Sequence, residues 1–205
     1  MSKNTMPLHK VAWIEELAIK IFNEIEVLTK DKVGVSRESY GKGETISINY
    51  MIDLAKEFGF YIEKDAAANV YLSLEKSTKN NHILIGSHID SVPQGGNFDG
   101  LAGVIAGFLI LVYLKEKKIK TSLPIKLLVL RGEESAWYGK NCIGSKALFG
   151  LISQEDLNST HRSNGKKLSK AMTESGVKLD QIRKCKTLIN KNEVEAFIEI
   201  HIEQG

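Results

Sequence analysis

The chain has 205 residues, and its 28 lysines and arginines nearly balance its 25 aspartates and glutamates, so the formal charge of +3 gives no reason to expect a nucleic-acid partner. Its hydrophobic content of 42% and charged content of 26% exclude a disordered or fibrous chain. Two cysteines without a CxxC spacing predict no disulfide framework and favour a reducing, cytoplasmic location. The longest apolar run, residues 101–114, is shorter than the roughly 20 residues of a membrane-spanning helix, so no membrane partner is expected.

The first half of the chain predicts two helices followed by short strands. Residues 10–30 carry apolar side chains at alternating three- and four-residue spacing, which is typical of an amphipathic helix. A glycine-bearing loop follows, and residues 46–60 predict a second helix. Residues 60–75 predict two short strands around a turn, and the apolar run at 82–88 predicts a strand that is buried on both faces.

The second half predicts an α/β arrangement. Residues 101–114 predict a buried helix, and residues 123–135 predict another strand that ends in polar residues. Strand, helix and strand in succession indicate a βαβ unit, hence a mixed, largely parallel sheet flanked by helices. One further helix is predicted near 166–176. Residues 194–205 predict a half-buried strand with four side chains on one face, namely Ala196, Ile198, Ile200 and Ile202.

Polar clusters follow three of the predicted strands. In open α/β sheets, ligands bind beyond the carboxyl ends of the strands, so these clusters are expected to converge. Imidazole and carboxylate groups without thiolate suit zinc and its neighbours among the divalent metals. The clusters are His88 with Asp90 and Asp99, then Glu133 with Glu134, and last His201 with Glu203 and Gln204.

The types and positions of these residues suggest distinct roles. Asp99 lies in a glycine-flanked loop and has two oxygens, so it can bridge two cations. Asp90 is placed to accept the spare imidazole N–H of His88 and to fix that ring. Glu133 and Glu134 are neighbours that point in different directions in an extended segment, so one can bind metal while the other faces a substrate as a base. Their mutual repulsion also favours a nearby cation or a shared proton.

Each cluster taken alone also fits a simpler interpretation. The first could be a capped loop, the glutamate pair could be an ordinary surface feature, and the last could be the polar face of an edge strand. Their coincidence at three strand ends of one sheet favours the metal site. The residues by themselves therefore predict a metal-dependent hydrolase.

Three blocks of sequence resemble a known family. "GSHIDSVPQGGNFDGLAGVIAG", "RGEESAWYGKNCIGSKALFG" and "FIEIHIEQG" are similar, in the same order, to the signatures of the zinc-dependent hydantoinase/carbamoylase group of aminoacylase-type metallopeptidases. That group includes N-carbamoyl-L-amino-acid hydrolases, allantoate amidohydrolases and β-ureidopropionases. The resemblance runs over nearly the whole chain. It implies a metallopeptidase (phosphorylase/hydrolase-like) catalytic domain and hydrolysis of a linear amide or ureido C–N bond.

The resemblance also implies a binuclear metal site. His88 and His201 would bind one ion, Asp99 would bridge, and Glu134 would bind the other. The implied cofactors are two divalent metal ions, with zinc favoured and manganese as the alternative.

The remaining roles concern the reaction itself. By resemblance, Glu133 is the general base that takes a proton from the attacking water, Asp90 orients His88, and Gln204 lies near the substrate's carbamoyl or amide group. The implied partner is a small amide or ureido substrate. An aminoacylase- or peptidase-type activity remains an alternative.

The resemblance implies that residues 1–205 are the N-terminal portion of the catalytic metal-binding domain. Relatives continue into a lid and dimerisation domain, through which they form homodimers, and then complete the catalytic domain with one more metal-binding histidine. We therefore expect the 205-residue chain alone to be a poor hydrolase. The alternative from another class is a truncated, inactive metal-binding fragment or interaction module.

Overall fold

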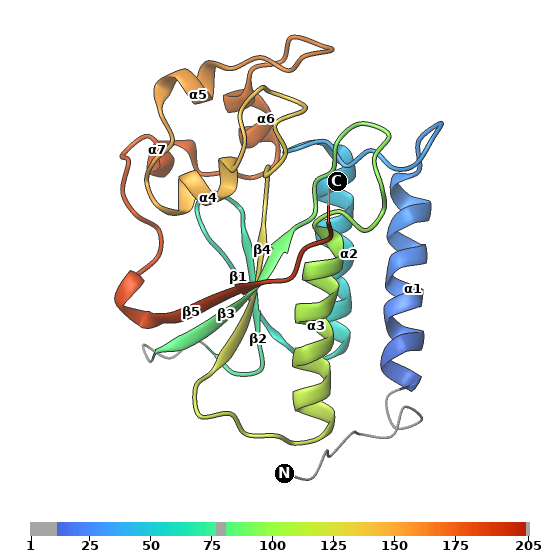
Figure 1. Ribbon diagram of the computed structural model, residues 1–205. Coiled ribbons are helices and arrows are strands. Elements are labelled where there is room, and N and C mark those ends of the chain that lie inside the picture. Colours follow the sequence, from blue (N-terminus) through green and yellow to red (C-terminus); the bar gives the residue numbers. More distant parts are fainter. Residues whose placement is uncertain (1–11, 77–80, 204–205) are drawn as a thin grey trace.

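A five-stranded mixed sheet lies at the centre of the computed structural model, which describes residues 12–76 and 81–203 (Figure 1). Its strands are β1 (Tyr61–Lys64), β2 (Val70–Ser73), β3 (His82–His88), β4 (Ile125–Leu130) and β5 (Val194–Glu199). The spatial order is β1-β2-β4-β3-β5; β3 is parallel to β4 and β5, whereas β2 is antiparallel to β1 and β4. A helical crossover between β3 and β4 produces the parallel pair, which confirms the α/β class expected from the sequence.

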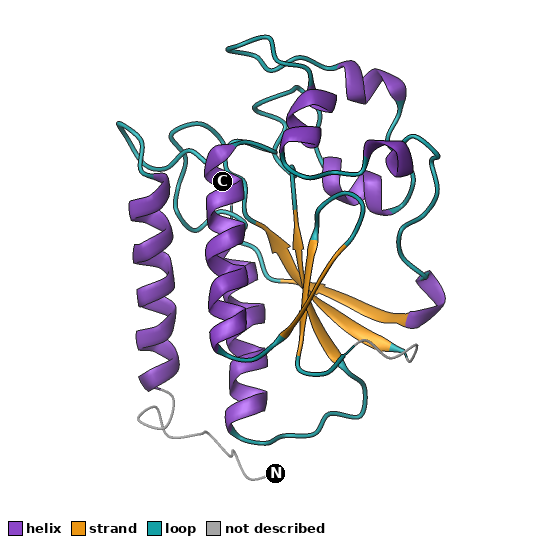
Figure 2. Ribbon diagram, turned by 180° about the vertical axis from the view of Figure 1, so that it is seen from behind, coloured by secondary structure: helices purple, strands orange, loops and turns teal. Residues whose placement is uncertain are grey.

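Three long helices cover one face of this sheet, as both ribbon views show (Figure 1, Figure 2). They are α1 (Ala12–Thr29), α2 (Lys42–Glu57) and α3 (Leu101–Glu116). The helix α3 contacts both the sheet and α1, so most of its circumference is buried, and its apolar residues need no polar stripe. Leu101, Phe108 and Leu111 are fully buried there. Within the described residues, no helix combines the length and apolarity that crossing a bilayer requires.

Short helices cover the opposite face and the end of the sheet. They are α4 (Ile143–Leu148), α5 (Gln154–Asn158), α6 (Leu168–Glu174) and α7 (Leu179–Ile182), followed by the 3-10 turn η2 (Lys191–Glu193). Only α6 corresponds to a helix predicted from the sequence. The other three have four to six residues, which is too short to display a helical repeat of apolar positions.

The last strand is shorter than the sequence predicted. Its ladder with β3 ends at Glu199, and the following described residues form a loop rather than a continuation of the strand. Ile198, Ile200 and Ile202 remain 50%, 48% and 37% exposed. In the described part of the chain β5 is an edge strand that pairs only with β3, so its alternating pattern is only partly covered. Beyond the ladder the backbone approaches α3, where the backbone oxygen of Ile200 lies against Gly103.

Close packing of β3 against β4 depends on the absence of a side chain at Gly86. A Cβ at this position would overlap the backbone carbonyl of Leu128. We expect Gly86→Ala to lower the free energy of unfolding by about 1–3 kcal/mol, because overpacking forces backbone shifts in a dense core. Urea denaturation of the 205-residue chain, followed by tryptophan fluorescence, measures the change. Gly96→Ala is the matched control, since a Cβ there meets nothing within 4 Å. Equal unfolding midpoints for the two variants would contradict this account.

Candidate metal centre

Three ligand-type side chains converge beyond the carboxyl ends of β3 and β5. His88 is the last residue of β3, His201 follows β5, and Asp99 lies in the loop that precedes α3. The Nε2 atoms of the two histidines are 3.2 Å apart. The Oδ1 atom of Asp99 lies 3.5 Å from Nε2 of His201 and 3.9 Å from Nε2 of His88. The structure therefore brings together three residues that are far apart in the sequence.

The hydrogen bonds of the two imidazoles determine which nitrogen carries the proton. Nδ1 of His88 lies 2.9 Å from the backbone oxygen of Asp90, and Nδ1 of His201 lies 2.9 Å from that of Ile202. A carbonyl can only accept, so each Nδ1 donates its N–H, and in the neutral rings both Nε2 atoms present lone pairs. Oδ1 of Asp99 is buried and has no hydrogen-bond partner. Three electron-rich atoms thus face one another, an arrangement that a cation stabilises.

The spacing and chemistry of these atoms fit zinc. Ligand atoms about 2.0 Å from a tetrahedral ion are about 3.3 Å from one another, close to the 3.2–3.9 Å separations observed. Two imidazole nitrogens and one carboxylate oxygen form a donor set that zinc favours. Three protein ligands also leave a fourth position for water or substrate, as in catalytic rather than structural zinc sites.

Gly103 in α3 allows the His201 segment to approach. The backbone oxygen of Ile200 lies where a Cβ of residue 103 would be, and that Cβ would also lie only 2.7 Å from the side chain of Ser87. Any side chain at this position would displace the backbone next to His201. Gly103 is therefore required by the close packing of α3 against the segment that carries His201.

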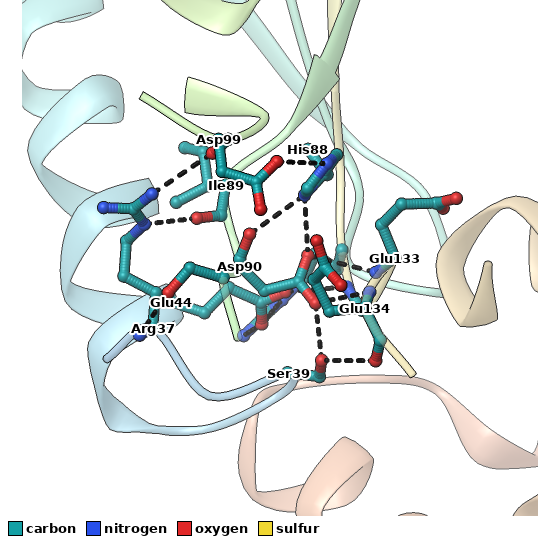
Figure 3. Close-up of polar contacts among 12 residues, drawn as sticks. Arg37, Ser39, Glu44, His88, Ile89, Asp90, Asp99, Glu133 and Glu134 are labelled. Atoms are coloured by element: carbon teal, nitrogen blue, oxygen red, sulfur yellow. Dashed lines mark hydrogen bonds and ion pairs between the residues drawn. The ribbon is translucent and has the colours of Figure 1, made fainter. Parts of the chain in front are cut away.

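Asp90 connects the separate parts of the site (Figure 3). Its fully buried carboxylate accepts hydrogen bonds from the backbone N–H groups of Glu133 and Glu134, each at 3.0 Å, and from the hydroxyl of Ser39. Its Oδ1 is also 3.3 Å from Nδ1 of His88. Burial alone would raise the pKa of Asp90, but the hydrogen bond and charge of His88 and the other donors hold it below its ordinary value.

The same contacts act on His88. Burial disfavours its imidazolium form, but the hydrogen bond and charge of Asp90, with the charges of Asp99 and Glu133, outweigh burial and raise the pKa of His88 to about 9. A proton at this position offsets the surrounding negative charge. A divalent cation would offset the same charge and displace that proton.

Glu134 lies beside Asp99. Burial and a hydrogen bond between the two carboxyl groups raise the pKa of Glu134 to about 7. Two carboxylates this close are stable only when they share a proton or bind a cation. The pair therefore marks a second position at which a cation could bind, adjacent to the His88–Asp99–His201 cluster.

Glu133 is directed differently from its neighbour. Its carboxylate points away from His88 and Asp99 (Figure 3), and its Oε1 accepts a hydrogen bond of 2.8 Å from the thiol of Cys142. Burial and the bond to Glu133 raise the pKa of the Cys142 thiol to about 11, so the thiol remains a donor. Oε2 of Glu133 is buried without a hydrogen-bond partner. The two adjacent glutamates thus occupy different environments, and only Glu134 meets the cluster.

Of the described residues in the third predicted cluster, His201 alone is placed among the three converging side chains. Gln204 is outside the described residues, and Glu203 is exposed. His161 is buried elsewhere, with its Nε2 3.1 Å from Oε1 of Glu38 and its ring stacked on Trp137.

Sequence reasoning missed three residues, from the segment after α1 through the first turn of α2, that support the site. Arg37, Ser39 and Glu44 are fully buried, although their segment reads as a polar, glycine-bearing loop. Glu44 accepts the backbone N–H of Gly132 at 2.8 Å and pairs with Arg131 at 2.6 Å, which fixes the backbone just before the glutamate pair. No local repeat distinguishes such buried charges from a solvated loop; only the unusual density of charge in "SRESYGKGE" could have drawn attention to them.

The network around Asp90 predicts the effect of Asp90→Asn. One amide N–H₂ would then face a backbone N–H donor, so a buried donor loses its acceptor. We expect the free energy of unfolding to fall by about 1–3 kcal/mol. Urea denaturation with EDTA measures this without a metal contribution. Asp53→Asn is the control, because that side chain is 69% exposed and its loss should change stability by no more than about 0.5 kcal/mol. Equal effects of the two variants would show that the Asp90 network contributes nothing.

Two curated relatives align with most of this chain. An uncharacterized hydrolase from Haemophilus influenzae is 34% identical over 174 residues, which cover 83% of this chain and 41% of that protein. The N-carbamoyl-L-amino acid amidohydrolase of Geobacillus stearothermophilus is 33% identical over 181 residues, which cover 88% of this chain and 44% of that protein. The chain thus spans less than half the length of these relatives.

The fold and a family profile agree with these relatives. A crystal structure of a hydantoinase/carbamoylase family amidase from Burkholderia ambifaria superposes with a TM-score of 0.78 at 24% identity, over 93% of this chain and 45% of that one. The relatives and this shared fold confirm the resemblance to the hydantoinase/carbamoylase group. The profile of peptidase family M28 matches residues 69–183, which include His88, Asp99 and both glutamates. Because this match covers more than half of the sequence, the chain belongs to peptidase family M28.

Proposed function

We propose that this chain carries the metal centre of a metal-dependent amidohydrolase, which uses water to cleave a linear amide or ureido C–N bond. The observation that carries the proposal is the convergence of His88, Asp99 and His201, whose ligand atoms all lie within 4.8 Å of one another. The reaction named for the Geobacillus stearothermophilus relative is of this class. We further propose that residues 1–205 correspond to the N-terminal portion of the catalytic domain, since the relatives are more than twice as long.

The proposed centre holds two divalent ions. His88, Asp99 and His201 would hold the first, and Asp99 together with Glu134 would supply carboxylates to the second. Zinc suits the imidazole-containing first position, and manganese is the alternative. In the described ranges only the two carboxylates serve the second position, so we propose that its remaining ligand comes from outside them. A two-carboxylate site holds zinc weakly without such a ligand.

The chemistry divides between the ions and the protein. When bound, the ions lower the pKa of water and polarise the substrate carbonyl. Glu133 acts as the general base that takes the proton from the attacking water and passes it to the leaving nitrogen. Asp90 fixes the backbone of Glu133, and the thiol of Cys142 holds its side chain away from the cluster. To act as the base, the side chain must therefore break the hydrogen bond to Cys142 and change rotamer. Asp90 holds His88 in the metal-binding tautomer, and Gln204 contacts the substrate.

The substrate class in this proposal is an N-carbamoyl amino acid, allantoate or a similar small molecule. The alternatives are an N-acyl amino acid or peptide substrate and a role as a metal-binding module without turnover. A homodimer and a cytoplasmic location, both expected from the sequence and its resemblance, complete the proposal. None of these features involves nucleic acid or a membrane.

The proposed centre predicts the zinc content of the protein. The 205-residue chain should bind zinc with a defined stoichiometry, and His88→Ala or His201→Ala should remove most of the first ion. Changes outside the ligands alone cost about 10–100-fold in affinity, so loss of a ligand should cost at least as much. Mass spectrometry of the native protein and a competing chromophoric chelator provide the measurements.

His161→Ala is the matched control for this experiment, because it deletes a buried histidine that is not in the cluster. We expect it to retain zinc as the unchanged protein does. Zinc retention in both ligand variants, or equal loss in all three, would rule out the proposed centre.

A further prediction distinguishes the role of Glu133 from that of Glu134 in the native protein. Glu133→Gln should retain metal while turnover falls by about 10²–10⁴-fold, the usual contribution of a general base. Glu134→Gln should instead reduce occupancy of the second ion. Turnover is measured on N-carbamoyl amino acids, allantoate, N-acyl amino acids and dipeptides, with zinc or manganese added.

The same panel tests the reaction class. Preference for the ureido compounds supports the proposal, whereas preference for N-acyl amino acids or dipeptides favours the aminoacylase or peptidase alternative. A metal-loaded protein without turnover on any of them would support the binding-module alternative. Equal metal loss in both glutamate variants would mean that the base and ligand roles are misassigned.

A further inference from the structure

Arg37 is a buried cation next to the proposed metal centre that the mechanism above does not use. It lies in the segment between α1 and α2, and none of its surface is exposed. Figure 3 shows its guanidinium directed at the loop that carries Asp99 and at the backbone that follows His88. A charged side chain this deeply buried requires a compensating environment.

The guanidinium bonds to both ends of the loop between β3 and α3, which follows His88 and carries Asp99. Nε donates to the backbone oxygen of Ile89 at 2.5 Å, which is the residue after His88. The two terminal nitrogens donate to Oδ1 and the backbone oxygen of Asn97, each at 3.1 Å, and to the backbone oxygen of Asp99 at 3.2 Å. One planar fork therefore spans from the strand end that carries His88 to Asp99 itself. The fixed geometry of guanidinium converts this span into a fixed spacing.

The backbone of Arg37 is anchored in the same place. Its N–H donates to the hydroxyl of Ser91 at 3.1 Å, and its carbonyl accepts the N–H of Ser91 at 3.0 Å. Two residues earlier, Val35 exchanges backbone hydrogen bonds with Gly95 at 3.0 and 2.8 Å. The side chain thus projects from a rigid ladder into the loop that it organises, so its position does not depend on the metal.

The partners of Arg37 differ from those of the other buried arginine that supports the site. Arg131 pairs directly with the carboxylate of Glu44 at 2.6 Å. All four acceptors of Arg37 are neutral oxygens, and the negative charges that act on it are those of Asp99 and Asp90. Burial lowers the pKa of Arg37 to about 10, and these two carboxylates oppose the decrease, so the group remains a cation at neutral pH.

We propose that Arg37 is a positioning residue for the metal centre: its guanidinium fixes the spacing between His88 and Asp99. This inference rests on the proposed function, because it assigns Arg37 a role toward the metal held there. It separates Arg37 from a purely structural arginine, whose loss would weaken the fold without changing the affinity of the folded site.

The test compares Arg37→Met, Arg37→Lys and Arg131→Met in the 205-residue chain. Zinc affinity is measured by competition with a chromophoric chelator, and cobalt(II) absorption reports the coordination geometry. Arg37→Met should raise the zinc dissociation constant about 10–100-fold, the usual cost of losing a group that orients metal ligands, and alter the cobalt spectrum. Arg37→Lys keeps hydrogen-bond donors but not the fork, so its loss of affinity should be smaller.

Arg131→Met is the control for general destabilisation. The side-chain partners of Arg131 are Glu44, Thr45 and Ser175. Arg131 supports the backbone before the glutamate pair and does not bond to the segments that hold His88, Asp99 and His201. We therefore expect Arg131→Met to lower the urea midpoint at least as much as Arg37→Met, while the affinity for the first zinc ion and the spectrum of the first cobalt ion stay the same.

The outcomes distinguish this inference from the proposed function. The role of Arg37 alone is overturned if the unmutated protein binds zinc and a folded Arg37→Met variant has the same zinc affinity and cobalt spectrum. If Arg37→Met does not fold, Arg37→Lys and Asn97→Ala decide, and unchanged zinc affinity in both overturns the role. Absence of zinc binding in the unchanged protein overturns both proposals.

Discussion

The buried carboxylate of Asp90 is the interaction on which the geometry of the site depends. It joins the end of β3 to the backbone of Glu133 and Glu134, and it binds Ser39 from the segment between the first two helices. The parallel register makes this possible, because His88 is opposite Leu130 and both strands end at the same level. Four donors converge on two oxygens, so the carboxylate is satisfied without solvent. The fold thus uses one buried charge to place His88 and the glutamate pair relative to each other.

Around this anchor the chain collects more negative charge than a stable interior tolerates. Asp90, Asp99, Glu133 and Glu134 lie within one small region. Burial together with Asp99 raises the pKa of Glu134, and, against the effect of burial, the neighbouring carboxylates raise the pKa of His88. Protons can neutralise part of this charge, and divalent cations can neutralise all of it. Such an accumulation is typical of sites where function opposes stability, and the apolar layer between α3 and the sheet compensates for its cost.

The sequence predicted the parts of this structure that depend on periodicity and topology. The strand at 82–88 and the helix at 101–114 show clear apolar patterns, and the structure brings His88, Asp99 and His201 together because parallel strands end at one edge of the sheet. The sequence could not reveal Arg37 or Glu44 as buried. Arg37 donates to the backbone oxygen of Ile89, and Glu44 accepts from the backbone N–H of Gly132, and both partners are more than fifty positions away. Nor could it predict the direction of Glu133, which depends on the thiol of Cys142. Side-chain partners distant in sequence leave no local pattern.

The three residues proposed to bind the first ion differ in how firmly the protein holds them. The side chains of His88 and Asp99 are 2% and 6% exposed and belong to the rigid network of Arg37 and Asp90, whereas the side chain of His201 is 33% exposed on a loop after the edge strand. Only two ligands are therefore fixed by dense packing. Because metal binding contributes its free energy to whatever structure completes the site, an ion held by His88 and Asp99 would stabilise the bound position of His201 and the segment beyond β5. A metal bound at the proposed centre would therefore also stabilise the edge of the sheet, where β5 pairs on one side only within the described residues.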